Sequence, residues 1–312
     1  MDKLDCALLA LLIENSRQPT TALAKKLKVS REVVNYRINK LIKEGIILNF
    51  ITEIDFEKMG FVSAAVFVNI KATTQKEFGE YLNKSPYVSW VAEQAGLWSF
   101  GFSIFGKTNL ELNEKFNQMY SLFKGAIIDH RFVLHKVNTF FYEKFFGVFN
   151  VTEKAKKYTT ETIDAYDKSI LKCLSKNSRI SYFELSGLVN LGQATVCDRV
   201  KKLERAGYIT RYSVFVDVSK LNIYQYSIFV INKNTDVKQK LIDYLALQKN
   251  ISFIAEYIGD QFIEFGIFVD NPYKLKPILN EIEERFPDNR VMEISLFQKD
   301  LVSVGLPDCV FQ

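Results

Sequence analysis

The chain has 312 residues, of which 48% are apolar, enough for roughly two to four compact domains with real cores, so the composition excludes a disordered regulator. The net charge of +5 permits binding to a polyanion but is too small to establish it. The four cysteines lack the CxxC spacing of zinc sites, and no apolar run reaches the roughly 18 residues of a membrane span. We therefore expect a cytoplasmic protein with reduced thiols and with no metal or cofactor.

Residues 1–60 carry the pattern of a winged helix-turn-helix domain. The leucine spacing and the break before Ser30 predict three helices, followed by a β-rich stretch that forms a small wing. Ser30 is placed to cap the third helix, and Gly45 to end it in a left-handed conformation. The expected elements are a helix over residues 4–13, a short helix ending near residue 27, a helix over residues 31–44 and the β-rich stretch over residues 46–54.

The third helix has an apolar face and a polar face. Val34, Ile38 and Leu41 share one side and must pack on the first two helices. An isolated polar helix face is usually only solvated, but in a helix-turn-helix its amides and cations suit base edges and phosphates in the major groove. Arg37 lies beside the apolar stripe, where a structural role and a phosphate contact are equally favoured ahead of base reading. We predict a DNA-contacting surface of Ser30, Arg31, Glu32, Asn35, Tyr36, Arg37, Asn39, Lys40 and Lys43.

Residues 61–137 predict an α+β domain in the order βαββαβ. This order is typical of an antiparallel sheet with two helices on one face, the ferredoxin-like arrangement. The expected strands cover residues 62–70, 87–95, 98–105 and 126–136, and the helices residues 75–82 and 110–123. Aromatic side chains such as Phe67, Trp90 and Phe100 are more numerous than one core needs, and the surplus predicts pairing with a second sheet.

Residues 138–162 are expected to be a linker that begins with an aromatic run and continues as a polar, basic segment. We expect the aromatic part to dock on the protein and the basic part to be solvated. The aromatic run consists of Phe140, Phe141, Tyr142, Phe145 and Phe146.

The rest of the chain repeats the first part. Asn15, Ser16 and Arg17 recur 162 positions later as Asn177, Ser178 and Arg179, and a shift of 163 fits the later residues. Features present in both copies count as shared structure or shared function. The repeat predicts a second winged helix-turn-helix over residues 163–222, a second βαββαβ domain over residues 223–300 and a tail over residues 301–312. Its expected helices cover residues 167–174, 193–206, 237–245 and 273–285, with a further short helix that ends at residue 189. Its expected strands cover residues 208–216, 224–231, 251–258, 262–269 and 290–299.

The third helix of the second copy offers a different set of polar side chains. Its apolar stripe is Val196, Val200 and Leu203, and Arg199 matches Arg37 in position. Because nearly every exposed position differs from the first copy, we expect the two helices to read different bases. The predicted DNA contacts are Gln193, Thr195, Asp198, Arg199, Lys201, Lys202 and Arg205.

Each copy resembles the Lrp/AsnC family, the feast/famine transcription regulators, over nearly its full length. The resemblance is carried by Leu4-Asp5, Asn15-Ser16-Arg17, Val29-Ser30 and Gly45-Ile46-Ile47, and in the second copy by Asp167, Asn177-Ser178-Arg179 and Gly207-Tyr208-Ile209. It implies a winged helix-turn-helix followed by a ligand-sensing RAM domain that pairs through its sheet into a dimeric α+β barrel. It also implies double-stranded DNA and an amino-acid effector as partners. This chain is expected to build the family's dimer within itself, as a covalent pseudo-dimer, with further self-association between chains open.

The resemblance places the effector at the hairpin in the middle of each sensing domain. It implies contacts from Gly96 and Trp98 in the first copy and from Gly259 and Gln261 in the second. Family sensing domains often carry an aspartate three residues after this glycine, and both copies lack it. The two glycines are therefore expected first as tight-hairpin residues and second as effector contacts.

Two other functions stay open beside DNA-binding regulation. Related tandem proteins decarboxylate a tetrapyrrole, but His130 and His135, the two histidines of the chain, lie five apart on one expected strand and so point to opposite faces. No phosphate loop, nucleophile elbow or metal-ligand cluster is present in the sequence. A protein-interaction scaffold that has lost DNA binding is the third hypothesis, because Ala194, Cys197 and Asp198 make the second polar helix less cationic at its start.

Overall fold

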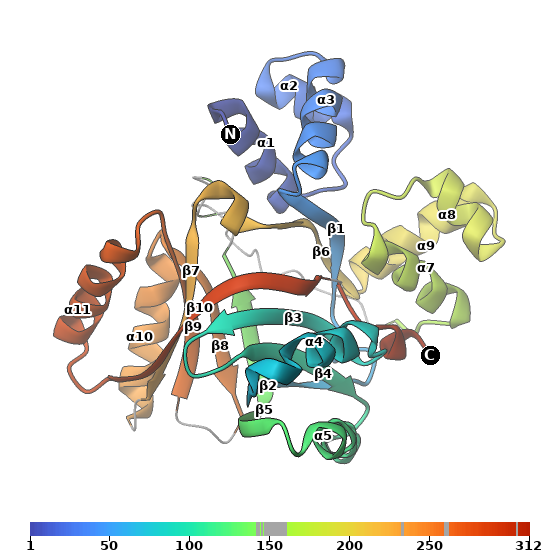
Figure 1. Ribbon diagram of the computed structural model, residues 1–312. Helices are drawn as coiled ribbons and strands as arrows, with labels where there is room; N and C mark the ends of the chain where they lie inside the picture. The colour runs from blue at the N-terminus through green and yellow to red at the C-terminus, as the bar shows by residue number, and fades with distance from the viewer. Residues whose placement is uncertain (142–143, 145, 147–160, 232–233, 259–261, 304) are drawn as a thin grey trace.

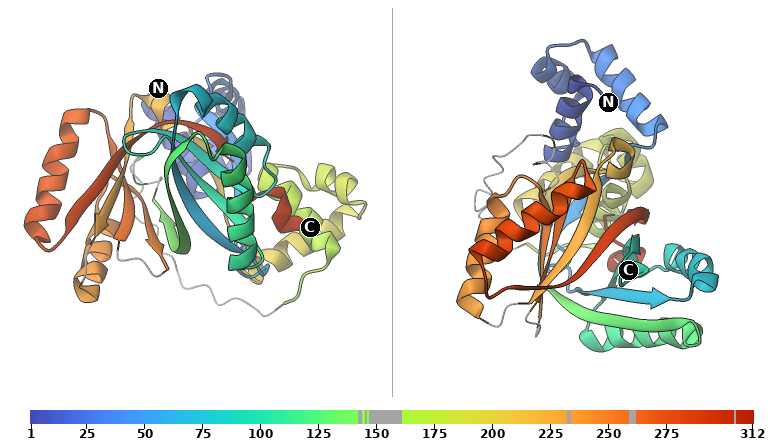
Figure 2. Two further views of the ribbon diagram at one scale, coloured as in Figure 1. Left: turned by 60° about the horizontal axis from the view of Figure 1, so that its bottom comes forward. Right: turned by 60° about the vertical axis from the view of Figure 1, so that its left-hand side comes forward.

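The computed structural model consists of two helical units beside one β-barrel (Figure 1). In Figure 1 the first unit lies above the barrel and the second to its right. The left view of Figure 2 again shows the second unit to the right of the barrel, and the right view again shows the first unit above it. The residues described are 1–141, 144, 146, 161–231, 234–258, 262–303 and 305–312. Of the expected aromatic run, Tyr142 and Phe145 lie outside these ranges, whereas Phe141 packs on the core of the second sensing domain and Phe146 on the first helical unit.

Each helical unit has the three helices that the sequence predicts. Val34, Ile38 and Leu41 are buried in the core of the first unit, and their counterparts in α9 are buried in the second. Ser30 caps α3 through its hydroxyl, which accepts a hydrogen bond from the Val33 amide at 3.3 Å, and Gly45 has φ +70° beyond the helix end. The helices are α1 Lys3–Glu14, α2 Thr20–Leu27, α3 Arg31–Lys43, α7 Ala165–Lys176, α8 Tyr182–Val189 and α9 Gln193–Arg205.

The two expected wings are one structure shared between the copies. Strand β1, Ile47–Ile54, pairs antiparallel with β6, Ile209–Val216, and the prediction of a separate wing for each unit is wrong. A lone strand leaves its backbone groups unpaired, and two such strands satisfy each other. The exchange extends to the cores, because Val214 of β6 is buried in the first unit and Ile54 of β1 in the second.

The eight remaining strands form a closed barrel in the order β10-β3-β4-β2-β5-β8-β9-β7. The first copy supplies β2 Val62–Ile70, β3 Val88–Ala95, β4 Phe100–Gly106 and β5 Ile127–Phe140, with helices η1 Ala72–Thr74, α4 Gln75–Lys84 and α5 Asn109–Phe123. The second copy supplies β7 Tyr224–Ile231, β8 Ile251–Tyr257, β9 Phe262–Val269 and β10 Arg290–Ser303, with helices η2 Val218–Leu221, α10 Thr235–Leu247, η3 Pro272–Lys274 and α11 Leu275–Arg285. The four long helices lie on the outside of the barrel (Figure 1).

The barrel closes through the last strand of each βαββαβ unit. Strand β5 continues past its expected end and pairs with β8, Thr139 opposite Ile254, while β10 pairs with β3, Lys299 opposite Glu93. This confirms the expected pairing of the two sheets and adds that they share backbone ladders. Phe100 fills its own domain's core, whereas Phe67 meets Phe229 edge to face inside the barrel, with ring centroids 5.0 Å apart.

The chain ends on the second helical unit. After β10, the short helix η4, Asp308–Phe311, brings Val310 into the core formed by α7, α8 and α9, where Leu306 is also buried. Phe105 of β4 belongs to the same core. The second helical unit thereby packs against the barrel through β4 and the segment after β10.

Candidate nucleic-acid interface

The polar face of α3 is exposed as the sequence predicts. Arg31, Asn35 and Asn39 are open to solvent along one side of the helix, and Tyr36 beside them is 68% exposed. Ser30, Glu32 and Lys43 are also exposed. Lys40 is half-buried and lies 3.9 Å from the Glu44 carboxylate one turn later. This face is free to meet a partner of groove width.

Arg37 points away from that face, toward the start of α1. Its Nη1 donates to Asp2 at 2.7 Å and to Asp5 at 2.6 Å, and the Asp5 side chain is buried. Asp2 caps α1, and hydrogen bonds from the Asp5 amide and the Arg37 guanidinium lower the pKa of its carboxyl below the usual value. Of the two roles that the sequence left open for Arg37, these contacts favour the structural one.

The second copy repeats this arrangement. Arg199 donates to Asp164 at 2.9 Å and to Asp167 at 2.8 Å, and Asp164 caps α7 as Asp2 caps α1. Lys202 also turns inward, with its Nζ 3.4 Å from an Asp167 oxygen. The signal was present in the sequence, since Asp2 and Asp5 recur 162 positions later as these two aspartates.

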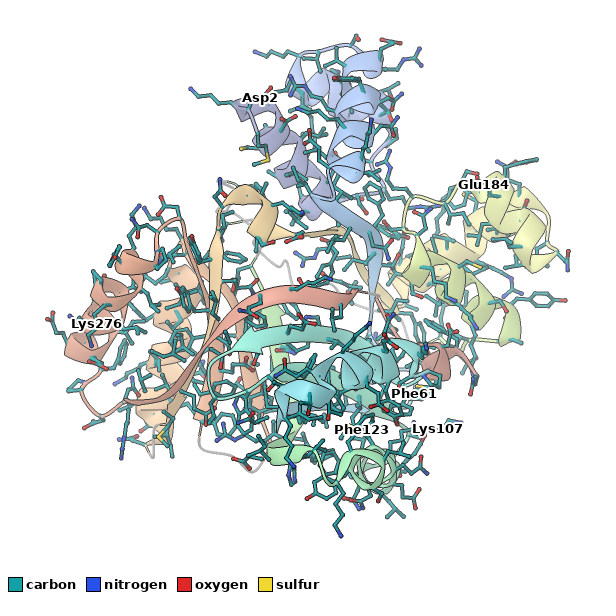
Figure 3. The ribbon with its side chains drawn as sticks, viewed as in Figure 1. Asp2, Phe61, Lys107, Phe123, Glu184 and Lys276 are labelled. Atoms are coloured by element: carbon teal, nitrogen blue, oxygen red, sulfur yellow. The ribbon has the colours of Figure 1, made fainter. Side chains whose placement is uncertain are left out.

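The polar face of α9 is exposed but carries different chemistry. Gln193, Thr195 and Asp198 are open to solvent at its start, and Lys201 and Arg205 near its end. The helix before it differs more. Where α2 has the exposed lysines Lys25 and Lys26, α8 has Gly187 and Leu188, and Leu188 is 65% exposed. Figure 3 shows the acidic Glu184 on α8, at the outer side of the second unit.

Lys25 and Lys26 belong to the candidate interface although only the third helices were expected there. They lie on α2, which precedes α3, the helix expected to enter the major groove. In helix-turn-helix complexes the helix before the groove-binding one crosses the DNA backbone. The lysine pair in an otherwise weakly polar helix is the sequence signal that identifies them.

The hairpin expected to hold an effector is packed between the two copies. Gly96 has φ +151°, and a Cβ there would lie 2.8 Å from the Ile294 carbonyl oxygen, so the position requires glycine. Trp98 is buried, and its indole Nε1 donates to Glu293 at 2.7 Å. Glu293 pairs with Arg131 at 2.5 Å, which joins β10 to β5 across the barrel. Gly259 and Gln261 lie outside the described residues.

The two histidines lie on opposite faces of β5, as the sequence predicts. His130 packs on Phe116 and Tyr120 of α5, outside the barrel. His135 stacks on Tyr257 inside, its Nδ1 is 2.9 Å from the Ser63 hydroxyl, and burial lowers its pKa to about 4. Tyr257 donates in turn to Glu264, whose pKa burial raises to about 7.

A family model of winged helix-turn-helix DNA-binding domains matches residues 1–47 and 163–210. The chain is 30% identical over 121 residues to the HTH-type transcriptional regulator LrpB of Bacillus subtilis. The matched region covers 38% of this chain and 80% of LrpB. It is also 30% identical over 125 residues to the HTH-type transcriptional regulator LysM of Saccharolobus solfataricus. That matched region covers 39% of this chain and 85% of LysM. The chain belongs to the Lrp/AsnC family. As a member that carries the unit twice, this Lrp/AsnC-family chain matches each of these relatives over less than half of its own length.

The architecture of this Lrp/AsnC-family chain also occurs in the solved structure of the siroheme decarboxylase NirDL. The two superpose with a TM-score of 0.63 at 14% identity, over 97% of this chain and 93% of NirDL. At that identity the likeness shows the fold alone. Among the described residues no helix has the length and apolar content to cross a bilayer, and no three His, Cys, Asp or Glu side chains gather as metal ligands.

Proposed function

We propose that this chain is a cytoplasmic transcription regulator that places α3 and α9 in the major groove of one DNA duplex. The observation that carries the proposal is the exposed polar face at the same position of both helical units, each with its apolar stripe buried. Amide and cationic side chains on such a face suit base edges and phosphates. The two units are held by a single chain, so they bind as a pair.

The proposed DNA site is asymmetric. Asn35 and Tyr36 of α3 correspond to Cys197 and Asp198 of α9, so the two helices offer different donors and acceptors. A palindromic site mirrors two identical subunits, and these units are not identical. We expect duplexes selected from a random library by the purified protein to contain two unlike half-sites. A perfect palindrome among the selected duplexes would contradict this.

Single substitutions assign the half-sites. Asn35→Ala is expected to relax base preference in one half-site and to weaken binding by about 1–3 kcal/mol if it reads a base. Asp198→Ala, at the position of α9 that corresponds to Tyr36, should change base preference only in the other half-site. Binding of the selected duplex and of single-base variants by fluorescence anisotropy measures both. Equal losses across all sequences would contradict base reading by Asn35.

The first unit is proposed to supply most of the phosphate contacts. Lys25 and Lys26 have no basic counterparts in α8. Replacing both by glutamine should lower the slope of log affinity against log salt by about two, roughly one for each lost phosphate contact. Replacing Lys201 and Arg205, two exposed cations of α9, by glutamine tests the second unit and should lower this slope less. Equal changes in the slope would mean that the two helical units contribute equally to phosphate binding. An unchanged slope after replacement of the second pair would support DNA binding by the first unit alone.

An amino-acid effector is proposed to act at the hairpin of Gly96 and Trp98. The support is the position of this hairpin between the copies, where Trp98, Glu293 and Arg131 form one polar cluster. An amino acid that enters there would change the surroundings of the Trp98 indole. Titration of the twenty amino acids, read by tryptophan fluorescence with Trp98→Phe as the control, tests this. Identical responses of the two proteins would place any effector elsewhere.

The decarboxylase alternative is tested by colour. The fold likeness to NirDL supports tetrapyrrole chemistry only at the level of architecture. Iron tetrapyrroles absorb strongly in visible light, so purified protein titrated with one would show a shifted band if it binds. Decarboxylation of the bound tetrapyrrole would favour the enzyme, and a colourless protein that binds duplex DNA selectively would favour the regulator.

A further inference from the structure

One arginine from each copy extends its side chain to the helical unit of the other copy, and we call this pair of contacts the crossing. Arg17 Nη1 donates to the carbonyl oxygens of Ser178 and Ile180, at 2.6 and 2.9 Å. Arg179 Nη1 donates in the same way to the carbonyl oxygens of Ser16 and Gln18. Each guanidinium therefore holds the turn between the first two helices of the other copy.

The serines beside these arginines meet at the centre of the crossing. Ser16 and Ser178 are fully buried, and their hydroxyl oxygens are 2.6 Å apart. Their amides extend the β1–β6 ladder, Ser16 N donating to Tyr212 O at 3.0 Å and Ser178 N to Phe50 O at 2.9 Å. The two turns are thus tied to each other and to the ladder.

The asparagine of each repeated triplet shapes the turn. Asn15 Oδ1 accepts from the Arg17 amide at 2.9 Å, and Asn177 Oδ1 accepts from the Arg179 amide at 2.9 Å. This is the asparagine turn that side-chain amides form with backbone two residues on. Every member of the triplet Asn-Ser-Arg, which the sequence repeats without change, has a contact in the crossing.

The crossing is held by hydrogen bonds and rings in place of ion pairs. In the described part of the chain, neither arginine has a carboxylate within 4.0 Å. Arg17 lies over the Tyr182 ring, 4.7 Å from its centroid, and Arg179 over the Phe50 ring at 5.5 Å. Burial and the charge of Arg17 lower the pKa of Arg179. Each arginine reaches its two carbonyls from one nitrogen, Nη1, whose N–H directions are fixed by the planar guanidinium. The N–H directions of a lysine ammonium rotate freely, so lysine would hold the same carbonyls less rigidly.

We infer that this crossing, the Asn-Ser-Arg clasp of residues 15–17 and 177–179, fixes the separation and orientation of α3 and α9. The DNA that the protein recognises then has two half-sites at one spacing. This inference rests on the proposed function for its DNA part, whereas its mechanical part stands without DNA. A clasp that only stabilises the fold would leave spacing preference unchanged when weakened.

The mechanical part is tested by measuring the distance between the two helical units. Spin labels at positions 21 and 183, on α2 and α8, occupy equivalent exposed sites outside the clasp. Cysteines 6, 173, 197 and 309 are first replaced, and double electron–electron resonance then gives the distance distribution. In the double variant Arg17→Lys and Arg179→Lys we expect a distribution at least about twice as wide, because lysine keeps the charge and loses the fixed N–H directions of the guanidinium. An unchanged distribution overturns the inference, and Arg17→Lys alone serves if the double variant does not fold.

The DNA part is tested by a spacing series on the selected site. Inserting about five base pairs between the half-sites turns them by about half a helical turn and should weaken binding of the unaltered protein at least about tenfold. In the double lysine variant we expect a penalty below about threefold. Arg285→Lys, an exposed arginine on α11, is the matched control and should keep the full penalty. If the inserted base pairs weaken binding equally in the double lysine variant and in the control, the inference is overturned. If the unaltered protein shows no selective DNA binding, the proposed function is overturned, and the distance measurement alone decides the role of the clasp.

Discussion

Glu264 is an ionisable side chain enclosed in the barrel. Ser227 and Tyr257 donate to its carboxyl group, and burial raises its pKa from 4.5 to about 7. The negative charge of Glu293 also raises this pKa, and the positive charge of Arg131 lowers it. Between these values the folded protein holds a proton that the unfolded chain has lost. Its contribution to stability is therefore complete below about pH 4.5 and is lost as the pH rises through about 7.

We expect Glu264→Gln to remove this loss, which is on the order of 3 kcal/mol at about 1.4 kcal/mol per pKa unit. Urea unfolding of both proteins between about pH 5 and 8.5 measures it. His135 acts in the opposite sense, since its lowered pKa removes stability only as the pH falls from 6.5 through about 4. Glu283→Gln, an exposed change on α11, is the control. Parallel pH curves for the unaltered protein and Glu264→Gln would show that Glu264 is not the titrating group.

Arg37 is predicted to stabilise the protein more than any exposed residue of α3. Its removal leaves the buried carboxylate of Asp5 without its cation, and breaking such a pair costs about 3 kcal/mol. Arg37→Ala should lower the free energy of unfolding by about that amount, and Lys43→Ala on the same helix by less than about 0.5 kcal/mol. Denaturant unfolding compares the two. Similar small losses would return Arg37 to the DNA-contacting surface.

At the scale of elements, the β3–β4 hairpin depends on one glycine. A Cβ at Gly96 would lie 2.8 Å from the Ile294 carbonyl oxygen and 2.9 Å from the Ser295 hydroxyl, and the backbone there has φ +151°. We expect Gly96→Ala to destabilise the protein by about 1–3 kcal/mol. Gly187→Ala on α8 meets nothing within 4 Å and should be neutral or stabilising by up to about 1 kcal/mol. Thermal unfolding distinguishes them, and a neutral Gly96→Ala would mean that the hairpin moves away from β10 with little strain.

Element order and several boundaries could be read from the sequence because they follow local periodicity. Strands β2, β7 and β9 begin and end at the predicted residues. The pairing of β1 with β6 could not be read, since a single strand has the same pattern whether its partner is a neighbouring hairpin or the distant copy. The extended ends of β5 and β10 were missed for the same reason.

The candidate interface was predictable where exposure follows from helix geometry. Asn35 and Asn39 are exposed because they lie opposite the apolar stripe. Arg37 and Arg199 lie beside the stripe, where helix geometry alone does not settle the partner. Their recurring aspartates settle it only once the two copies are aligned and the long reach of arginine across to the first helix is considered.

At the scale of the whole molecule, one copy alone has two unsatisfied edges. In the intact chain β5 of the first copy pairs with β8, and β3 pairs with β10. Because β8 is the counterpart of β3 and β10 of β5, a fragment of residues 1–141 should close the same barrel with a second fragment. We expect a dimer by light scattering after gel filtration. A folded monomer would show that the edges can be covered within one copy.

The closed barrel joins its two halves by backbone ladders within one polypeptide. Ordinary homodimers fall apart on dilution, and a change in their gene alters both subunits at once. Here the partnership survives at any concentration, and each half can acquire substitutions that the other never receives. The divergence between the lysines of α2 and the leucine and glycine of α8 is the kind of specialisation that such a tethered pair permits.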